Sequence, residues 1–147
     1  MTEASRDTIQ LAKPVIGDRE VELVTQVLRS GQLSLGGMLA RFEDAWAERA
    51  GVAHAVACSS GTAGLHACFH AMGLGPGDEV IVPSFSFVAS ANAILFTGAT
   101  PVFVEVDPLT FNLDPAAVEA AITPRTKAIE IVDIFGYPAE LNALIEI

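Results

Sequence analysis

Basic residues and cysteines are scarce in this chain of 147 residues. Eight Lys and Arg stand against 18 Asp and Glu, which gives a formal net charge of −10 with His neutral. Because an acidic chain repels phosphate at long range, this balance excludes a general nucleic-acid surface or an anionic membrane surface. Cys58 and Cys68 are too few for a disulfide framework, which indicates a cytoplasmic protein with two buried, inert thiols.

The sequence also has no secretory signal among its first residues, which are polar. One stretch without charge, Val80 to Val104, is long enough to cross a bilayer. Pro83, Gly98 and Pro101 interrupt it, so we predict strand, helix and strand there and no membrane partner. With 51% apolar residues, the chain is large enough for one domain with a buried core.

Helical and strand patterns alternate along the chain. Two amphipathic helices are expected first, ending at Gly31 and Gly51, with Trp46 in the core. Apolar runs then predict four buried strands, at residues 52–58, 79–83, 102–106 and 127–136. Helices are expected between and after them, at residues 62–73, 87–98, 114–122 and 138–147, with Asp114 as an N-cap. This order predicts an α/β fold with a mostly parallel, doubly wound sheet.

The last residues, LNALIEI, stop in mid-pattern without a helix cap. We therefore expect a truncated chain, the alternative being a short last helix that frays.

The junction Ser59-Ser60-Gly61-Thr62-Ala63 is the first candidate site. A buried strand is predicted to run through it into a helix, which leaves the first N–H groups of that helix unpaired. Such a turn can bind an anion, with hydroxyls of Ser60 and Thr62 as further donors, although many turns of this kind bind nothing. The sequence matches neither the Walker A pattern nor GxGxxG.

The segment Pro83-Ser84-Phe85-Ser86-Phe87 is the second candidate. It follows the next predicted strand, at the edge where open α/β sheets bind ligands. One of its rings is placed to cover a flat heterocycle whose phosphate sits at residues 61–63, while the alternative is that both rings belong to the core.

Four blocks in register resemble one family. They are SSGTAGLH (59–66), GPGDEVIVPSFSFVASANAI (75–94), GATPVFVEVD (98–107) and FGYPAEL (135–141), preceded by LAKPVIG, SGQLSLG and RFE. Their sequence and spacing resemble those of the pyridoxal-phosphate-dependent nucleotide-sugar aminotransferases of the DegT/DnrJ/StrS type, from about Leu11 to the last residue.

The resemblance implies a fold-type I large domain, of which residues 1–147 would be the N-terminal portion, with the rest of that domain and a small C-terminal domain absent. Pyridoxal 5'-phosphate would be the cofactor, its phosphate held by Gly61, Thr62 and Ala63 with help from Ser60. Phe87 would stack on the pyridine ring, and Asp133 would lie near its other face or the substrate.

The implied reaction moves an amino group, usually from glutamate, to a keto-sugar nucleotide in sugar, polysaccharide or antibiotic biosynthesis, in a homodimer. The chain departs from this chemistry because its two lysines, Lys13 and Lys127, match no Schiff-base position. No catalytic residue is expected in the chain, which should not transaminate alone. Ile131, where many relatives have proline, is a lesser departure.

Three other functions stay open at this point. Some relatives are sugar dehydratases; a non-catalytic cofactor-binding or dimerising remnant is a second alternative, and a dinucleotide-binding domain a third. His66 and His70 have the i, i+4 spacing of two metal ligands, but no third ligand is evident, so no metal site is expected.

Overall fold

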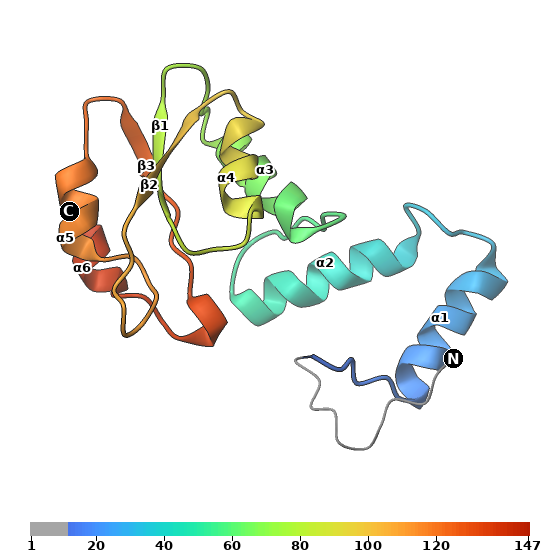
Figure 1. Ribbon diagram of the computed structural model, residues 1–147. Coiled ribbons are helices and arrows are strands. Elements are labelled where there is room, and N and C mark those ends of the chain that lie inside the picture. Colours follow the sequence, from blue (N-terminus) through green and yellow to red (C-terminus); the bar gives the residue numbers. More distant parts are fainter. Residues whose placement is uncertain (1–11) are drawn as a thin grey trace, which may run out of the picture. The chain divides into compact units, whose positions relative to one another are not determined.

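The computed structural model describes residues 12–147, which belong to two compact units, Met1–Ala57 and Cys58–Ile147. The first unit contains helices α1 (Asp18–Ser30) and α2 (Gly37–Ala50) (Figure 1). Both helices end as predicted, because Gly31 and Gly51 each take φ of 70°, a left-handed conformation that favours glycine.

The apolar stripes of these two helices are exposed, so the placement of Trp46 in the core was wrong. Trp46 is 59% exposed and its ring lies 6.0 Å from that of Phe42, which is also exposed. Ala47 is the buried residue of α2, and α1 buries none. The spacing of apolar residues predicted the helices correctly, but it does not determine which surface covers their stripes.

The second unit is an α/β structure whose elements follow the predicted order. Its helices are α3 (Gly61–Ala71), α4 (Ala89–Leu95), α5 (Pro115–Ala121), the 3-10 turn η1 (Ile134–Gly136) and α6 (Leu141–Glu146). Its strands are β1 (Glu79–Pro83), β2 (Thr100–Val104) and β3 (Thr126–Ile129). As predicted, Asp114 caps α5, its carboxylate accepting a hydrogen bond of 2.9 Å from the Ala116 N–H.

The three strands form a parallel sheet in the order β2-β1-β3, with β1 in the centre. All five residues of β1 are buried, as expected for a parallel strand covered on both faces. The uncharged stretch from Val80 to Val104 is thus divided into β1, α4 and β2. Among the described residues, no helix is both long and apolar enough to span a membrane.

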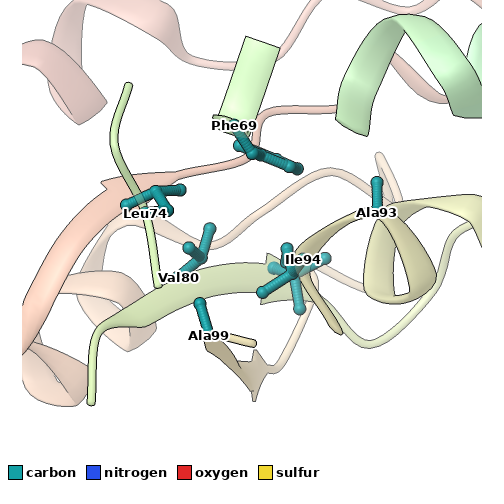
Figure 2. Close-up of a cluster of buried hydrophobic side chains, with 7 residues drawn as sticks. Phe69, Leu74, Val80, Ala93, Ile94 and Ala99 are labelled. Carbon is teal, nitrogen blue, oxygen red and sulfur yellow. The ribbon is translucent and has the colours of Figure 1, made fainter. Parts of the chain in front are cut away.

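Each face of the sheet has its own core. Val80 and Val82 point to one side, where Figure 2 shows Val80 beside Phe69, Leu74, Ala93, Ile94 and Ala99. Ile81 points to the other side and packs with a second group: Val104, Leu113, Val118 and Leu144. This alternation follows from the period of two in a strand. Helices α3 and α4 therefore cover one face, and α5 and α6 the other (Figure 1).

The strand predicted at Val52–Cys58 is wrong, because this segment forms no strand in the structure and most of it is exposed. Val56, for example, is 81% exposed. Cys58 and Cys68 are exposed as well, which corrects the expectation of two buried thiols. An apolar run predicts burial only where a neighbouring strand and covering helices are present to bury it.

At the amino end of the sheet, a buried carboxylate fastens β1 to the turn before β3. Glu79 accepts hydrogen bonds from the Thr123 hydroxyl at 2.5 Å and from Nε of Arg125 at 2.9 Å, and it also forms an ion pair with Nη2 of Arg125. These groups, Thr123 first, lower the pKa of Glu79.

We expect this site to make the fold sensitive to acid. The pKa of Glu79 is lower in the folded chain than in the unfolded chain, so its carboxylate contributes fully to the free energy of unfolding at neutral pH. This contribution is lost as the pH falls below the ordinary glutamate pKa and through the pKa of Glu79 in the folded chain. Urea unfolding at several pH values should show a shallower acid-side decline for Glu79→Gln than for the unsubstituted chain. Exposed Glu119→Gln is the control. Equal declines for Glu79→Gln and the unsubstituted chain would contradict the assignment.

Candidate functional site

The start of α3 presents two backbone N–H groups that lack acceptors. Ser60 is the extended N-cap residue, and its hydroxyl accepts from the Ala63 N–H at 3.1 Å, while its carbonyl accepts from the Gly64 N–H at 3.1 Å. Within residues 12–147 no acceptor is found for the N–H groups of Gly61 and Thr62, which precede the first bonded turn. Of the two amides predicted to bind phosphate, that of Thr62 is available and that of Ala63 is capped.

The turn at the start of α3 is exposed at Ser60 and Gly61, while Thr62 is half-buried. A Cβ built on Gly61 would meet no atom within 4 Å. The start of α3 lies at the end of the sheet where β1 runs into the loop before α4 (Figure 1). The helix dipole adds positive partial charge there, so this position suits an anion even though the chain as a whole is acidic.

The two phenylalanines of the second candidate segment differ in their surroundings. Phe85 is 45% exposed, and its ring centre lies 5.4 Å from that of Phe111 and 6.2 Å from that of Phe135. Phe87 is 75% exposed and has no ring contact within the described part of the chain. Phe87 is therefore the ring of this segment that remains available to a ligand.

Asp133, the remaining predicted site residue, lies beyond the carboxyl end of β3. It is exposed and directly precedes η1. One of its carboxylate oxygens accepts from the Ala139 N–H at 2.9 Å, which closes the loop that follows. Asp133 thus lies in the loop beyond β3, because the strand predicted at residues 127–136 ends at Ile129, and its own loop uses part of its hydrogen-bonding capacity.

Three further features of this edge were missed at the level of sequence. Asn112 is buried, and its amide donates to the Tyr137 carbonyl at 2.9 Å and accepts from the Ile134 N–H at 3.1 Å. Phe111 and Phe135, both in contact with Phe85, adopt positive φ values of 62° and 52°. No local sequence signal marks these residues, since their roles depend on contacts between distant loops.

Glu130, the third feature, is a buried acid directly after β3, and burial raises its pKa. Here the sequence did carry a signal, because a lone charged residue interrupts the apolar run AIEIV.

Neither of the two lysines is buried. Lys13 and Lys127 are both exposed, and Lys127 is in the first half of β3, toward the amino end of the sheet. The arrangement at the carboxyl edge thus supplies N–H groups, hydroxyls and a ring, but no amine.

The hollows of the surface do not coincide with the predicted residues. One of about 560 Å³ lies within the first unit, between the end of α1 and the start of α2, and another of about 270 Å³ lies beside the Asn112 loop. Neither is lined by residues 60–63, Phe87 or Asp133.

No cluster of His, Cys, Asp or Glu in the described part could hold a metal ion, and His66 instead contacts Phe96, with ring centres 5.4 Å apart.

Comparison with known proteins identifies the family. Residues 14–147 match the model of the DegT/DnrJ/EryC1/StrS aminotransferase family. The chain belongs to this family. The resemblance predicted from the four sequence blocks is thereby confirmed.

Individual relatives agree with this assignment. The chain is 46% identical over 140 residues, or 95% of its length, to GDP-perosamine synthase of Caulobacter vibrioides. It is 42% identical over its whole length to the spore coat polysaccharide biosynthesis protein SpsC of Bacillus subtilis. It spans 38% of the length of each of these two relatives.

The fold is also that of solved family members. The PMP-form of the putative sugar aminotransferase Spr1654 from Streptococcus pneumoniae superimposes with a TM-score of 0.89 and 34% sequence identity, over 94% of this chain and 35% of that one. The predicted α/β fold with a parallel sheet, that of a fold-type I aminotransferase large domain, is therefore confirmed for this aminotransferase-family chain.

Proposed function

We propose that the chain forms the part of a pyridoxal-phosphate-dependent sugar aminotransferase that holds the cofactor phosphate and one face of its ring. The observation that carries the proposal is the start of α3, where the N–H groups of Gly61 and Thr62 have no acceptor among residues 12–147 and Gly61 is exposed. These donors fit a phosphate, and no Cβ at Gly61 blocks its approach.

The roles of the site residues follow from their positions. The N–H groups of Gly61 and Thr62, with the Thr62 hydroxyl, bind phosphate oxygens. The Ala63 N–H contributes only when its 3.1 Å bond to the Ser60 hydroxyl opens, whereas that hydroxyl, which accepts in this bond, can still donate its own hydrogen to a phosphate oxygen. Phe87 offers its exposed ring to the heterocycle. Asp133 lies near the ring or the substrate, with one oxygen bonded to its own loop.

The bound cofactor supplies an electron sink for moving an amino group from an amino acid, glutamate in this proposal, to a keto-sugar nucleotide. The names of the relatives, among them GDP-perosamine synthase and SpsC, support a sugar nucleotide in polysaccharide biosynthesis as the acceptor. The described site contains donors for binding and a ring for orientation, and both lysines are exposed elsewhere. We therefore propose that this chain binds the cofactor without transaminating, and that a functional unit is a cytoplasmic homodimer.

Cofactor binding tests the proposal directly. Equilibrium dialysis should show that the chain binds pyridoxal phosphate more tightly than pyridoxal, because only the former bears the group recognised by α3. Thr62→Ala removes a hydrogen bond to a charged group, worth about 1.5–3 kcal/mol, so affinity for pyridoxal phosphate should fall about tenfold or more. Phe87→Leu should weaken both ligands. Thr25→Ala, in α1, is the matched control.

Four results would contradict the proposal. Equal affinity for the two ligands would show that the phosphate is not recognised. An unchanged affinity of Thr62→Ala for pyridoxal phosphate would show that the Thr62 hydroxyl does not bind the phosphate. Binding of a nicotinamide dinucleotide without binding of pyridoxal phosphate would favour a dinucleotide-binding domain instead. A borohydride-reduced adduct of defined stoichiometry at Lys13 or Lys127 would overturn the conclusion that the chain has no Schiff-base lysine.

A further inference from the structure

A buried asparagine joins the loops that follow β2 and β3. Asn112, which is 4% exposed, lies in the loop after β2. Its side-chain amide donates to the Tyr137 carbonyl at 2.9 Å, and its side-chain oxygen accepts from the Ile134 N–H at 3.1 Å. Both partners are backbone groups of the loop after β3, 25 and 22 residues further along the chain. One side chain therefore fixes the separation of the two loops.

The loop after β2 is itself closed by hydrogen bonds around Asn112. The backbone carbonyl of Asn112 accepts from the Asp107 N–H at 2.9 Å, and the Phe111 N–H donates to the Asp107 carbonyl at 2.8 Å. The carboxylate of Asp107 also accepts from the N–H groups of Leu109 and Thr110, at 2.9 and 2.8 Å. The backbone that carries Phe111 is thus held on both sides.

Two phenylalanines link these loops to the turn after β1. Phe111, next to Asn112, has its ring centre 5.4 Å from that of Phe85, and the ring centre of Phe135 lies 6.2 Å from it. Phe111 and Phe135 adopt positive φ, 62° and 52°, a conformation that bulky side chains rarely take. Such strain persists only where surrounding contacts offset it, and the ring contact that the two phenylalanines share is with Phe85.

Phe85 belongs to the turn that carries Phe87. At the start of this turn, the Ser84 N–H donates to the carbonyl of the last residue of β2 at 2.9 Å. At its end, the Phe87 carbonyl accepts from the Ser90 N–H at 3.1 Å. The middle of the turn is held by the bond of 2.8 Å between the Ser86 and Ser90 hydroxyls and by the two rings that contact Phe85.

We propose that Asn112 is a positioning residue, which holds the candidate binding groups after β1 and β3 at a fixed separation. It acts on the turn of residues 84–88 through the two phenylalanines, and on Asp133 through the Ile134 N–H, the amide that directly follows Asp133. What the turn and Asp133 do toward pyridoxal phosphate rests on the proposed function, whereas the joining of the three loops does not.

Amide exchange of the ligand-free chain, followed by NMR, tests the joining of the loops. Phe111→Asn removes the ring but keeps a residue that tolerates left-handed backbone. Because an aromatic pair contributes a factor of about two to ten, the Ser84 and Ser90 amides at the two ends of the turn should exchange faster by about that factor. Leu35→Asn is the matched control, since Leu35 also has positive φ, 50°, but is 87% exposed and lies in the first unit.

Asn112→Ala tests the asparagine itself. The Ser90 and Tyr137 amides, which lie in two different loops, should both exchange faster by about fivefold or more, because each lost hydrogen bond of a buried group has at least this effect. This acceleration should exceed that of the Met72 amide at the end of α3, which reports a general loss of stability. If only the amides of residues 133–138 accelerate beyond Met72, Asn112 does not hold the turn and the proposal is wrong.

The ring variants decide the matter even where Asn112→Ala does not fold. Phe135→Asn should have a smaller effect than Phe111→Asn, because the Phe135 ring is 86% exposed and lies farther from Phe85. If both variants leave exchange of the Ser84 and Ser90 amides as it is in the matched control, the rings do not hold the turn and the proposal is overturned.

Ligand binding shows whether the positioning reaches Phe87. Phe111→Asn should weaken pyridoxal phosphate and pyridoxal by the same factor, about two- to tenfold, because the α3 amides that recognise the phosphate are unchanged. In a Phe87→Leu background the same substitution should have no further effect, since the ring on which it acts is absent. Losses that add in the double variant would show that Phe111 does not act through Phe87, which overturns the proposed positioning.

These outcomes also separate the positioning from the proposed function. If the unsubstituted chain binds no pyridoxal phosphate but the amides of the turn respond as expected, the proposed function fails and the joining of the loops stands. If the chain binds pyridoxal phosphate as proposed but exchange in the turn does not respond to the ring variants, the positioning is wrong and the proposed function stands.

Discussion

Replacing Ile81 by alanine is expected to lower the free energy of unfolding by about 2–5 kcal/mol. Ile81 is fully buried in the centre of the middle strand, and it is the residue of β1 that packs toward α5 and α6. Its neighbours Val118 and Leu144 belong to two different helices, which cannot both move into the space left by the deleted atoms. The loss therefore includes the cavity as well as the transfer of the side chain.

Urea unfolding followed by far-ultraviolet circular dichroism measures this loss. Ile145→Ala, at a position in α6 that is 70% exposed, is the matched control and should change stability by no more than about 0.5 kcal/mol. A loss below 1 kcal/mol for Ile81→Ala would mean that the second core closes over the vacant site. An altered slope against urea would point to a change in the unfolded or native state rather than to the cavity alone.

Asn112→Ala should cost about 2–4 kcal/mol, the second largest effect. Its buried side chain bonds to both ends of η1, at the Ile134 N–H and the Tyr137 carbonyl. Alanine leaves both backbone groups without this partner, and each such loss costs about 1–3 kcal/mol where water cannot replace it. Because η1 follows Asp133 and contains Phe135, exchange of the amides of residues 133–138 should accelerate as well.

Two comparisons check this assignment. Asn142→Ala, at an exposed position in α6, should leave unfolding unchanged within about 0.5 kcal/mol. Asn112→Asp retains the acceptor for the Ile134 N–H but places a buried carboxylate oxygen against the Tyr137 carbonyl, so it should be less stable than the unsubstituted chain. If Asn112→Asp is as stable as the unsubstituted chain, the bond to Tyr137 contributes nothing.

Local sequence signals predicted most elements of the fold because their physical causes are local. Gly31 and Gly51 end helices since they tolerate left-handed backbone, and Asp114 begins one since its carboxylate pairs with a helix N–H. The apolar run in EVIVP predicted a buried strand, which the structure places at the centre of the sheet. Four blocks of residues then indicated the family, which residues 14–147 match.

Burial was less predictable, because it depends on what lies opposite a residue. Val56 and Trp46 belong to strongly apolar patterns, yet both are exposed in this chain. Conversely, Glu79 and Glu130 are buried, one with partners at a distance of more than forty residues and one with an unpaired oxygen. The sequence gives the polarity of each side chain, but it does not show which residues pack against that side chain in the fold.

The same reason limits prediction of the candidate site. Composition predicts that a helix begins at residues 60–63. It does not predict that the Ser60 hydroxyl caps the Ala63 N–H and leaves the Gly61 and Thr62 amides available, because this depends on the side-chain rotamer of Ser60. Similarly, the residues of the segment PSFSF alone predicted a ring over a ligand without indicating which one, and only the family resemblance pointed to Phe87. The contacts of Phe85 with Phe111 and Phe135, from two distant loops, decide that it is Phe87.

The contacts that stabilise the parallel sheet and the candidate binding residues lie at opposite ends of the sheet. Its amino end is held by Glu79, Thr123 and Arg125, which anchor the strands. Its opposite end bears the amides of α3 and the turn of Phe87. Substitutions in the loops at the carboxyl end can therefore change which ligand is bound without affecting the contacts of Glu79 at the amino end. Related proteins with this sheet can thus differ in ligand specificity while keeping the same fold.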